Sequence, residues 1–132
     1  MRRFFPSLLL LLAACSPEAA KPPVERLLYA GEGRDRLCLA GERGGFIVYG
    51  EGDANCSTRG PVERTGNRLV LTPEGDPDCR IEAKLDGDRL TLGVRAEACA
   101  YHCGPGANFA GKGLTKNLSA SPAVDFAGDP LC

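Results

Sequence analysis

Residues 79–94 read CRIEAKLDGDRLTLGV, and their apolar side chains recur with a period of two. Asp86-Gly87 lies in the middle of the stretch, and Asp-Gly between two alternating segments is a strong signal for a tight hairpin. The stretch therefore predicts two antiparallel strands, each with one buried and one solvated face. The side chains predicted to face the core are Cys79, Ile81, Ala83 and Leu85, then Leu90, Leu92 and Val94.

The same alternation, bounded by turn residues, predicts five more strands. They are Arg26–Ala30, Arg36–Ala40, Gly45–Tyr49, Val62–Arg64 and Leu69–Thr72. Gly66-Asn67 forms the turn between the last two. Seven short strands in succession indicate an all-β fold, a small antiparallel meander closing into a barrel or a sandwich. Only Ala96–Tyr101 suggests a helical turn, and the polar segment after Gly113 is expected to be irregular.

The composition fits one small domain without a strong electrostatic field. The chain has 132 residues and a formal net charge of −1, and this length supports a single domain with a modest core. Its 17 glycines and 10 prolines suit turns better than helices. No basic face is present for a nucleic acid, which excludes that class of partner from the prediction.

The N-terminus has the layout of an export signal. Arg2 and Arg3 precede an apolar run at residues 4–14, which is shorter than the roughly 20 residues that a membrane-spanning helix needs. The run ends in Leu-Ala-Ala-Cys at residues 12–15, and this sequence closely resembles the lipobox of bacterial lipoproteins. There are two alternatives. One is an ordinary cleaved signal with a chance cysteine beside the cleavage site, and the other is an N-terminus that is retained.

The lipobox resemblance implies that Cys15 becomes the first mature residue and carries the acyl chains that hold the protein on membrane lipid. In that family, an aspartate directly after the cysteine implies retention in the inner membrane. The residue here is Ser16, which implies the outer membrane, with the protein on its periplasmic side. We therefore expect a signal peptide at residues 1–14, the lipidated cysteine and a flexible, proline-containing tether at 15–24, and one disulfide-rich β domain at 25–132.

With Cys15 assigned to lipid, six cysteines remain, and an even number in a small exported domain predicts three disulfides. They are Cys38, Cys56, Cys79, Cys99, Cys103 and Cys132. We pair Cys56 with Cys79, because these two residues flank a predicted hairpin. Cys132 is expected to hold the C-terminal tail against the body of the domain.

Residues 99–111 read CAYHCGPGANFAG and contain the single histidine of the chain. Cys99, His102 and Cys103 are residue types that bind zinc, and a Cys–His pair can form a nucleophile. Because disulfides would consume the thiols, a disulfide-pinned loop is the favoured interpretation. Residues 74–78, Glu-Gly-Asp-Pro-Asp, offer oxygen ligands for calcium but are more typical of a turn. We predict no cofactor, metal or catalytic residue.

Residues 106–113, Gly-Ala-Asn-Phe-Ala-Gly-Lys-Gly, resemble the Ser-Gly-Ala-x-Tyr…Gly loop of the membrane-bound inhibitors of c-type lysozyme. Those proteins are small β-barrel lipoproteins with a disulfide, and the serine of their loop enters the enzyme's cleft between its two catalytic carboxylates. The matching position here is Pro105, which has no hydroxyl, and Phe109 replaces the tyrosine. The candidate residues of a binding loop are Tyr101, His102, Gly104, Pro105, Gly106, Asn108 and Phe109.

The sequence does not assemble an acid, a base and a nucleophile, so we expect a non-catalytic protein with a binding or structural role in the cell envelope. One alternative is an inhibitor of a lysozyme-type cell-wall hydrolase, and another is a periplasmic metal-binding protein. The expected partners are membrane lipid, through acyl chains on Cys15, and an envelope protein or cell-wall hydrolase.

Overall fold

The structure is a computed structural model that describes residues 13–15 and 24–132. The predicted signal peptide and most of the predicted tether lie outside the described residues. Within the described ranges, no helix has both the length and the apolar character needed to cross a bilayer.

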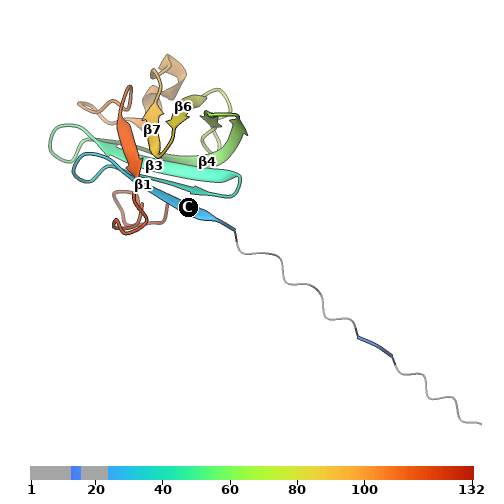
Figure 1. Ribbon diagram of the computed structural model, residues 1–132. Helices are drawn as coiled ribbons and strands as arrows, with labels where there is room; N and C mark the ends of the chain where they lie inside the picture. Colours follow the sequence, from blue (N-terminus) through green and yellow to red (C-terminus); the bar gives the residue numbers. More distant parts are fainter. Residues whose placement is uncertain (1–12, 16–23) are drawn as a thin grey trace, which may run out of the picture.

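The fold is a closed antiparallel barrel in which each strand pairs with the next one in sequence and the last pairs with the first (Figure 1). The predicted all-β meander is thereby confirmed, and of the two predicted forms, barrel and sandwich, the structure is a barrel. Its strands are β1 Arg26–Ala30, β2 Arg36–Ala40, β3 Arg43–Tyr49, β4 Asn55–Thr65, β5 Arg68–Leu71, β6 Ile81–Asp86, β7 Arg89–Leu92 and β8 Gly113–Lys116.

The hairpin of residues 79–94 forms as β6 and β7, with Asp86 opposite Arg89. The turn consists of Gly87 and Asp88, and Gly87 has a φ of 59°, the conformation that glycine adopts without steric cost. Side chains of β6 alternate between buried and exposed as expected. The prediction for Val94 was wrong: β7 ends at Leu92, and Val94 is 86% exposed.

The prediction of an irregular segment after Gly113 was also wrong, because residues Gly113–Lys116 form β8. This strand closes the barrel by pairing with β7 on one side and β1 on the other. Only one of its side chains, Leu114, is buried. A strand of four residues with a single inward apolar side chain has no alternation to reveal it.

Aliphatic and aromatic side chains from the strands and loops fill the barrel. The largest fully buried side chains are Phe46, Phe109, Ile47, Ile81, Leu90, Leu92 and Leu114. Most of these contact one another in a single cluster, so the barrel is a packed core in the manner of other small barrels.

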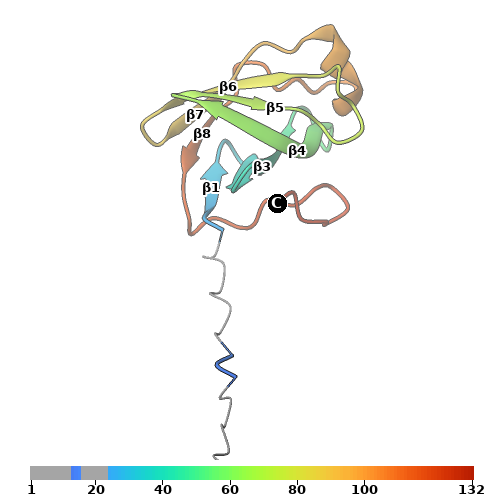
Figure 2. The ribbon, with the colours of Figure 1, turned by 90° about the vertical axis from the view of Figure 1, so that its right-hand side faces the viewer.

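A second, smaller cluster lies outside the barrel, where the C-terminal segment crosses β2 and β3 (Figure 2). Ile47 from β3 packs there with Ala123 and Leu131 of the segment. The Cys38–Cys132 disulfide fixes its end, which confirms the prediction that Cys132 holds the tail to the body.

The two ends of the barrel have different connections. At the end where β1 begins, adjacent strands are joined by three two-residue turns, at residues 41–42, 66–67 and 87–88. We call this end the mouth. At the opposite end, which we call the locked end, the connections are the longer segments 31–35, 50–54, 72–80 and 93–112.

Candidate binding surface

The central feature of the locked end is a short 3-10 helix, η1, at Glu97–His102, which agrees with the helical turn expected at Ala96–Tyr101. Two disulfides fix this segment. Cys99 within the helix is bonded to Cys79, and Cys103 directly after it is bonded to Cys56. A rigid attachment therefore occurs twice within five residues.

The predicted Cys56–Cys79 pairing was wrong. Only the last part of β4, from Val62 onward, pairs with β5, so Cys56 at the start of β4 lies opposite Val48 of β3 instead. Its nearest neighbour across the barrel end is the extended residue Cys103, with which it forms an isolated bridge. Sequence proximity to the hairpin was therefore a poor guide to the spatial neighbour.

A third attachment joins η1 to the 72–80 connection. The Nε2 atom of His102 lies 2.7 Å from Oδ2 of Asp76, and their side chains are only 11% and 28% exposed. Asp76 is itself held in a turn, since its carbonyl accepts a hydrogen bond from the Cys79 amide. The histidine is thus half-buried and paired, and it helps to fix the residue before it.

Tyr101, between these attachments, is 90% exposed. Among the described aromatic rings its one stacking partner is His102, at 5.6 Å between centroids in an edge-to-face arrangement. A tyrosine ring is a large apolar surface with a polar tip, and here it stands in solvent on a segment that is fixed at Cys99, His102 and Cys103.

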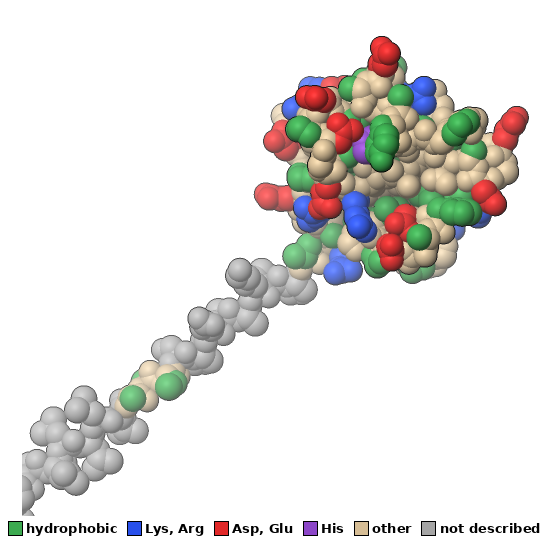
Figure 3. Space-filling view, turned by 180° about the vertical axis from the view of Figure 1, so that it is seen from behind, with side chains coloured by type: hydrophobic (Ala, Val, Ile, Leu, Met, Phe, Trp, Pro, Cys, Tyr) green, Lys and Arg blue, Asp and Glu red, His purple; other side chains and the backbone are tan. Residues whose placement is uncertain are grey.

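A shallow hollow beside Tyr101 is lined by polar groups from the β3–β4 connection and the start of β4. We call this area the Tyr101 surface, and its residues are Asp53, Ala54, Asn55, Ser57, Tyr101, His102, Cys103, Gly104 and Pro105. Figure 3 shows this side of the molecule, with the single histidine in purple. The surface offers a carboxylate, an amide and a hydroxyl around one exposed ring.

The polar side of this hollow is also held in place. The side-chain amide of Asn55 donates to the carbonyl of Asp53, and the amide of Gly104 donates to the carbonyl of Asn55. Arg34 forms a salt bridge with Asp53 at 3.1 Å and stacks over the ring of Tyr49 at 3.8 Å. The hollow therefore has a defined shape without a ligand.

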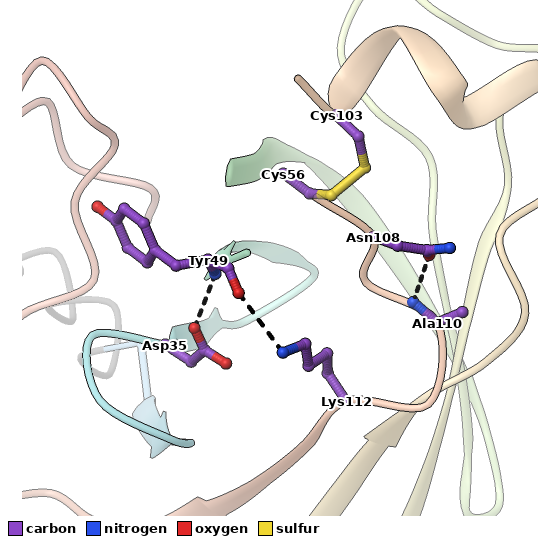
Figure 4. The surroundings of a disulfide bond; sticks show 7 residues. All are labelled: Asp35, Tyr49, Cys56, Cys103, Asn108, Ala110 and Lys112. Atoms are coloured by element: carbon purple, nitrogen blue, oxygen red, sulfur yellow. Dashed lines mark hydrogen bonds between the residues drawn. A yellow bond between two sulfur atoms is a disulfide. The ribbon is translucent and has the colours of Figure 1, made fainter. Parts of the chain in front are cut away.

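The predicted binding loop divides into exposed and buried residues. Phe109 is fully buried and packs against Phe46, with 5.5 Å between ring centroids, so its side chain closes the core and cannot contact a partner. Asn108 is exposed, and its side chain accepts a hydrogen bond from the Ala110 amide (Figure 4). The remaining predicted residues are exposed or half-buried: Tyr101, His102, Gly104, Pro105 and Gly106.

The end of this loop is tied to the end of β3. Lys112 donates a long hydrogen bond of 3.5 Å to the carbonyl of Tyr49, and the amide of Tyr49 donates to the buried carboxylate of Asp35 at 2.8 Å (Figure 4). With Phe109 in the core, the segment 104–112 acts as a cap on the locked end, not as a free arm.

The disulfides leave few ligands for a metal. The donor atoms of Asp76, Cys79 and His102 lie within 4.8 Å of one another, but Cys79 is in a disulfide and has no thiolate to give. Asp76 and His102 are then the two remaining ligands, whereas a structural zinc site has four. The calcium interpretation of residues 74–78 meets a similar obstacle, because Glu74 contacts Arg43 and Asp76 contacts His102.

A Cys–His nucleophile would need a free thiol beside His102, and both neighbouring cysteines are in disulfides. Over residues 13–15 and 24–132 the one free cysteine is Cys15, which is exposed. Ser57 lines the same hollow as His102, but no hydrogen bond joins its hydroxyl to the imidazole in the described structure. The surface therefore has polar groups for binding but no aligned nucleophile and base.

Sequence reasoning missed the residues that come from outside the 99–111 stretch. Asp53, Asn55 and Ser57 were not candidates, and Asp76 was interpreted only as a turn residue. No local signal marks them, since their role depends on the disulfides that bring residues 53–57 and 76–79 beside η1.

No protein-family model matches this chain, and no curated protein or solved structure matches it either. The likenesses to lipoproteins and to lysozyme inhibitors therefore depend on the short motifs at residues 12–15 and 106–113.

Proposed function

We propose that this protein is a lipid-anchored binding protein of the bacterial outer membrane, on the periplasmic side, and that it contacts an envelope partner through the Tyr101 surface. One observation carries the proposal: Tyr101 is 90% exposed although two disulfides and the His102–Asp76 pair fix the segment that bears it.

The physical argument concerns entropy. Binding usually loses free energy when loops and side chains become ordered, and prior rigidity reduces that loss. Tyrosine is also among the residues that most often dominate interface energies. Two of the three disulfides fix η1 and the residue directly after it. Tyr101 nevertheless packs against little beyond His102. Stability of the barrel alone does not require an exposed ring at this place.

The topology is compatible with a membrane anchor at Cys15. The chain enters the barrel at Val24 and β1, which lie at the mouth, whereas Tyr101 lies at the locked end. Residues 15–24 span at most about 30 Å when fully extended. With acyl chains on Cys15, the tether would join the barrel at the mouth, and the Tyr101 surface would lie at the end away from the attachment point.

The anchor is tested by mass spectrometry of the mature protein. We expect Cys15 at the N-terminus with acyl groups, and loss of membrane association in a Cys15→Ser variant. An unmodified Cys15 in the mature chain, or retention of residues 1–14, would contradict the anchor but would leave the Tyr101 surface to be tested separately.

The binding surface is tested by photo-crosslinking in intact cells, with a photoreactive residue in place of Tyr101. A matched position is Phe126, which is 61% exposed and lies in the C-terminal segment. We expect a discrete envelope adduct from position 101 and none from position 126. Adducts of equal yield from both positions would indicate non-specific collisions and would refute the proposal.

Inhibition of a lysozyme-type hydrolase is a second candidate, favoured by one feature. The segment that resembles the inhibitor loop lies directly beside Tyr101, and its residues Pro105 and Gly106 are exposed. A turbidity assay of c-type lysozyme on cell walls tests it. We expect inhibition that Tyr101→Ala weakens, and no inhibition at micromolar protein would remove this candidate.

A further inference from the structure

The residues that line the Tyr101 surface include one large apolar side chain, the ring of Tyr101 itself. The rest of the apolar lining consists of Ala54, Pro105 and the disulfide-bonded Cys103. The centre of a protein–protein interface is usually richer in aromatic and other apolar side chains. The surface is therefore an isolated aromatic ring in a polar setting, and this arrangement suits a ligand that is itself mostly polar.

The polar groups beside the ring are free to bind such a ligand. Asn55 and Ser57 extend from the same face of β4, because Cys56 between them points into the core. Among the described residues, no hydrogen bond uses the hydroxyl of Ser57 or of Tyr101. The side-chain nitrogen of Asn55 donates to the Asp53 carbonyl, which leaves its amide oxygen as a free acceptor. The hollow thus offers both donors and acceptors.

The charges at the hollow are compensated by their neighbours. The carboxylate of Asp53 accepts a hydrogen bond from the guanidinium of Arg34 through Oδ1, at 3.1 Å, and its other oxygen stays available as an acceptor. The imidazole of His102 is paired with Asp76. Since each charged group has a partner beside it, the hollow does not favour an ion, and a neutral ligand with many hydrogen-bonding groups fits it best.

The ring and the polar groups are also fixed relative to each other. Cys103 lies two residues after Tyr101 and is bonded to Cys56. Asn55 and Ser57 are the neighbours of Cys56 in β4. A single disulfide therefore holds the exposed ring beside the groups that would bind the edge of a ligand stacked on it.

A pyranose ring of a saccharide has the matching chemistry. Its axial C–H groups make one face apolar, and they pack favourably on the electron-rich face of an aromatic ring. The hydroxyls at its edge both donate and accept hydrogen bonds. Each of these bonds replaces one to water, so its net gain is small. Partners that are already fixed lose less entropy on binding, and this is the property that the disulfide provides.

We propose that the Tyr101 surface binds a pyranose ring of a glycan. The apolar face of the sugar stacks on Tyr101, and its hydroxyls bond to Asn55, Ser57 and the free carboxylate oxygen of Asp53. The inference rests on the Tyr101 surface as the binding site of the proposed function, and it does not need the lipid anchor. Two sources share this chemistry, a cell-wall strand of N-acetylated hexosamines and a polysaccharide of unsubstituted hexoses.

The test is a titration of the full chain carrying Cys15→Ser, followed by nuclear magnetic resonance. The probes are tetra-N-acetylchitotetraose and cellotetraose, which share a linkage and differ in the acetamido group at each carbon 2. Sorbitol at the same concentration of hydroxyl groups is the control, because it has no ring face. We expect a tetrasaccharide to shift the signals of residues 53–57 and 101–104, and sorbitol to leave them unchanged. If neither tetrasaccharide shifts them, or if sorbitol shifts them equally, the proposal is wrong.

Variants separate stacking from non-specific attraction. Tyr101→Ala is expected to weaken binding of the tetrasaccharide about tenfold and Ser57→Ala about threefold, whereas Tyr101→Phe keeps the ring and should keep most of the affinity. The matched control is Phe126→Ala, which removes another exposed ring, in the C-terminal segment, and should leave the affinity unchanged. Equal losses for Tyr101→Ala and Phe126→Ala, or for Tyr101→Ala and Tyr101→Phe, would overturn the site.

The two probes also identify the source of the sugar. If the N-acetylated tetramer binds more tightly, the ligand is a cell-wall strand. If cellotetraose binds as tightly or more tightly, the ligand is a polysaccharide of unsubstituted hexoses. Both results retain the pyranose site.

Failure of this inference is distinguishable from failure of the proposed function. A protein adduct from photo-crosslinking at position 101, with no shift from either tetrasaccharide, would make the partner a protein. That result refutes the glycan and retains the Tyr101 surface. No adduct and no shift would refute both.

Discussion

At the locked end of the barrel, two disulfides, a His–Asp pair and the ring of Phe109 hold the long connections together. At the mouth, tight turns join the strands, and neither a disulfide nor an aromatic plug covers the leucines exposed there within the described residues. The molecule has thus stabilised one end by cross-links and left the other open.

The two ends also differ in shape. The locked end presents a convex feature, one exposed ring on a rigid support, whose advantage is a small loss of entropy on binding. The mouth presents a concave feature, a hollow with partly buried aliphatic side chains on its floor. Perturbing the two ends should therefore give different patterns of lost stability and lost binding.

The largest expected effect concerns Phe109, whose ring closes the core at the locked end. Phe109→Ala removes a fully buried ring and should lower the free energy of unfolding by about 3–5 kcal/mol. Leu39→Ala at the mouth removes a side chain that is already partly solvated, and should cost about 1–2 kcal/mol. Urea denaturation of both variants checks this. Equal losses would mean that the two ends are equally well packed.

The second prediction concerns the disulfide that joins η1 to the 72–80 connection. Replacing both Cys79 and Cys99 with alanine removes a bridge between residues 20 apart in sequence and should lower the free energy of unfolding by about 3 kcal/mol. It should also abolish crosslinking from position 101. Replacing Cys38 and Cys132 is the control, because their bridge fixes the C-terminal segment; that variant should lose stability and keep the crosslink.

The third and smaller effect comes from the His102–Asp76 pair. His102→Ala leaves the half-buried carboxylate of Asp76 without its partner, and the expected loss is about 1–2 kcal/mol. The exposed pair Arg68–Glu82 is the matched control, and Glu82→Gln should cost less than about 0.5 kcal/mol. Thermal unfolding measures both. A loss for His102→Ala no greater than for Glu82→Gln would show that the pair does not fix η1.

Much of the barrel could be predicted from the sequence because alternation is a local property. The bounds of β1 and β2 agree with the predicted segments, and the strongest hairpin signal produced β6 and β7. The strand β8 was missed because it is stabilised by pairing with β1 and β7 and has no alternating apolar residues of its own. Strand closure is a property of the whole sheet, which no single segment encodes.

The sites were less predictable, for a physical reason. Tyr101 and Phe109 belong to one short stretch and were equal candidates for binding, yet one is 90% exposed and the other is fully buried. In a loop, the direction of a side chain depends on long-range attachments such as Cys56–Cys103, not on a repeating pattern.

The smallest effect is a change in alkaline stability that originates at the mouth. Burial raises the pKa of the Tyr29 phenol above its ordinary value of 10.0. Below that value the phenol is neutral in both the folded and the unfolded chain, so its contribution to stability is fully present. As the pH rises above 10.0, the unfolded chain releases the proton first, and stability is lost until the folded phenol also ionises.

Tyr29→Phe removes this titration. We therefore expect wild type and variant to show the same change in unfolding free energy between pH 7 and pH 9, and the wild type to lose more above pH 10. A parallel loss in both proteins would contradict the raised pKa of the Tyr29 phenol in the folded chain.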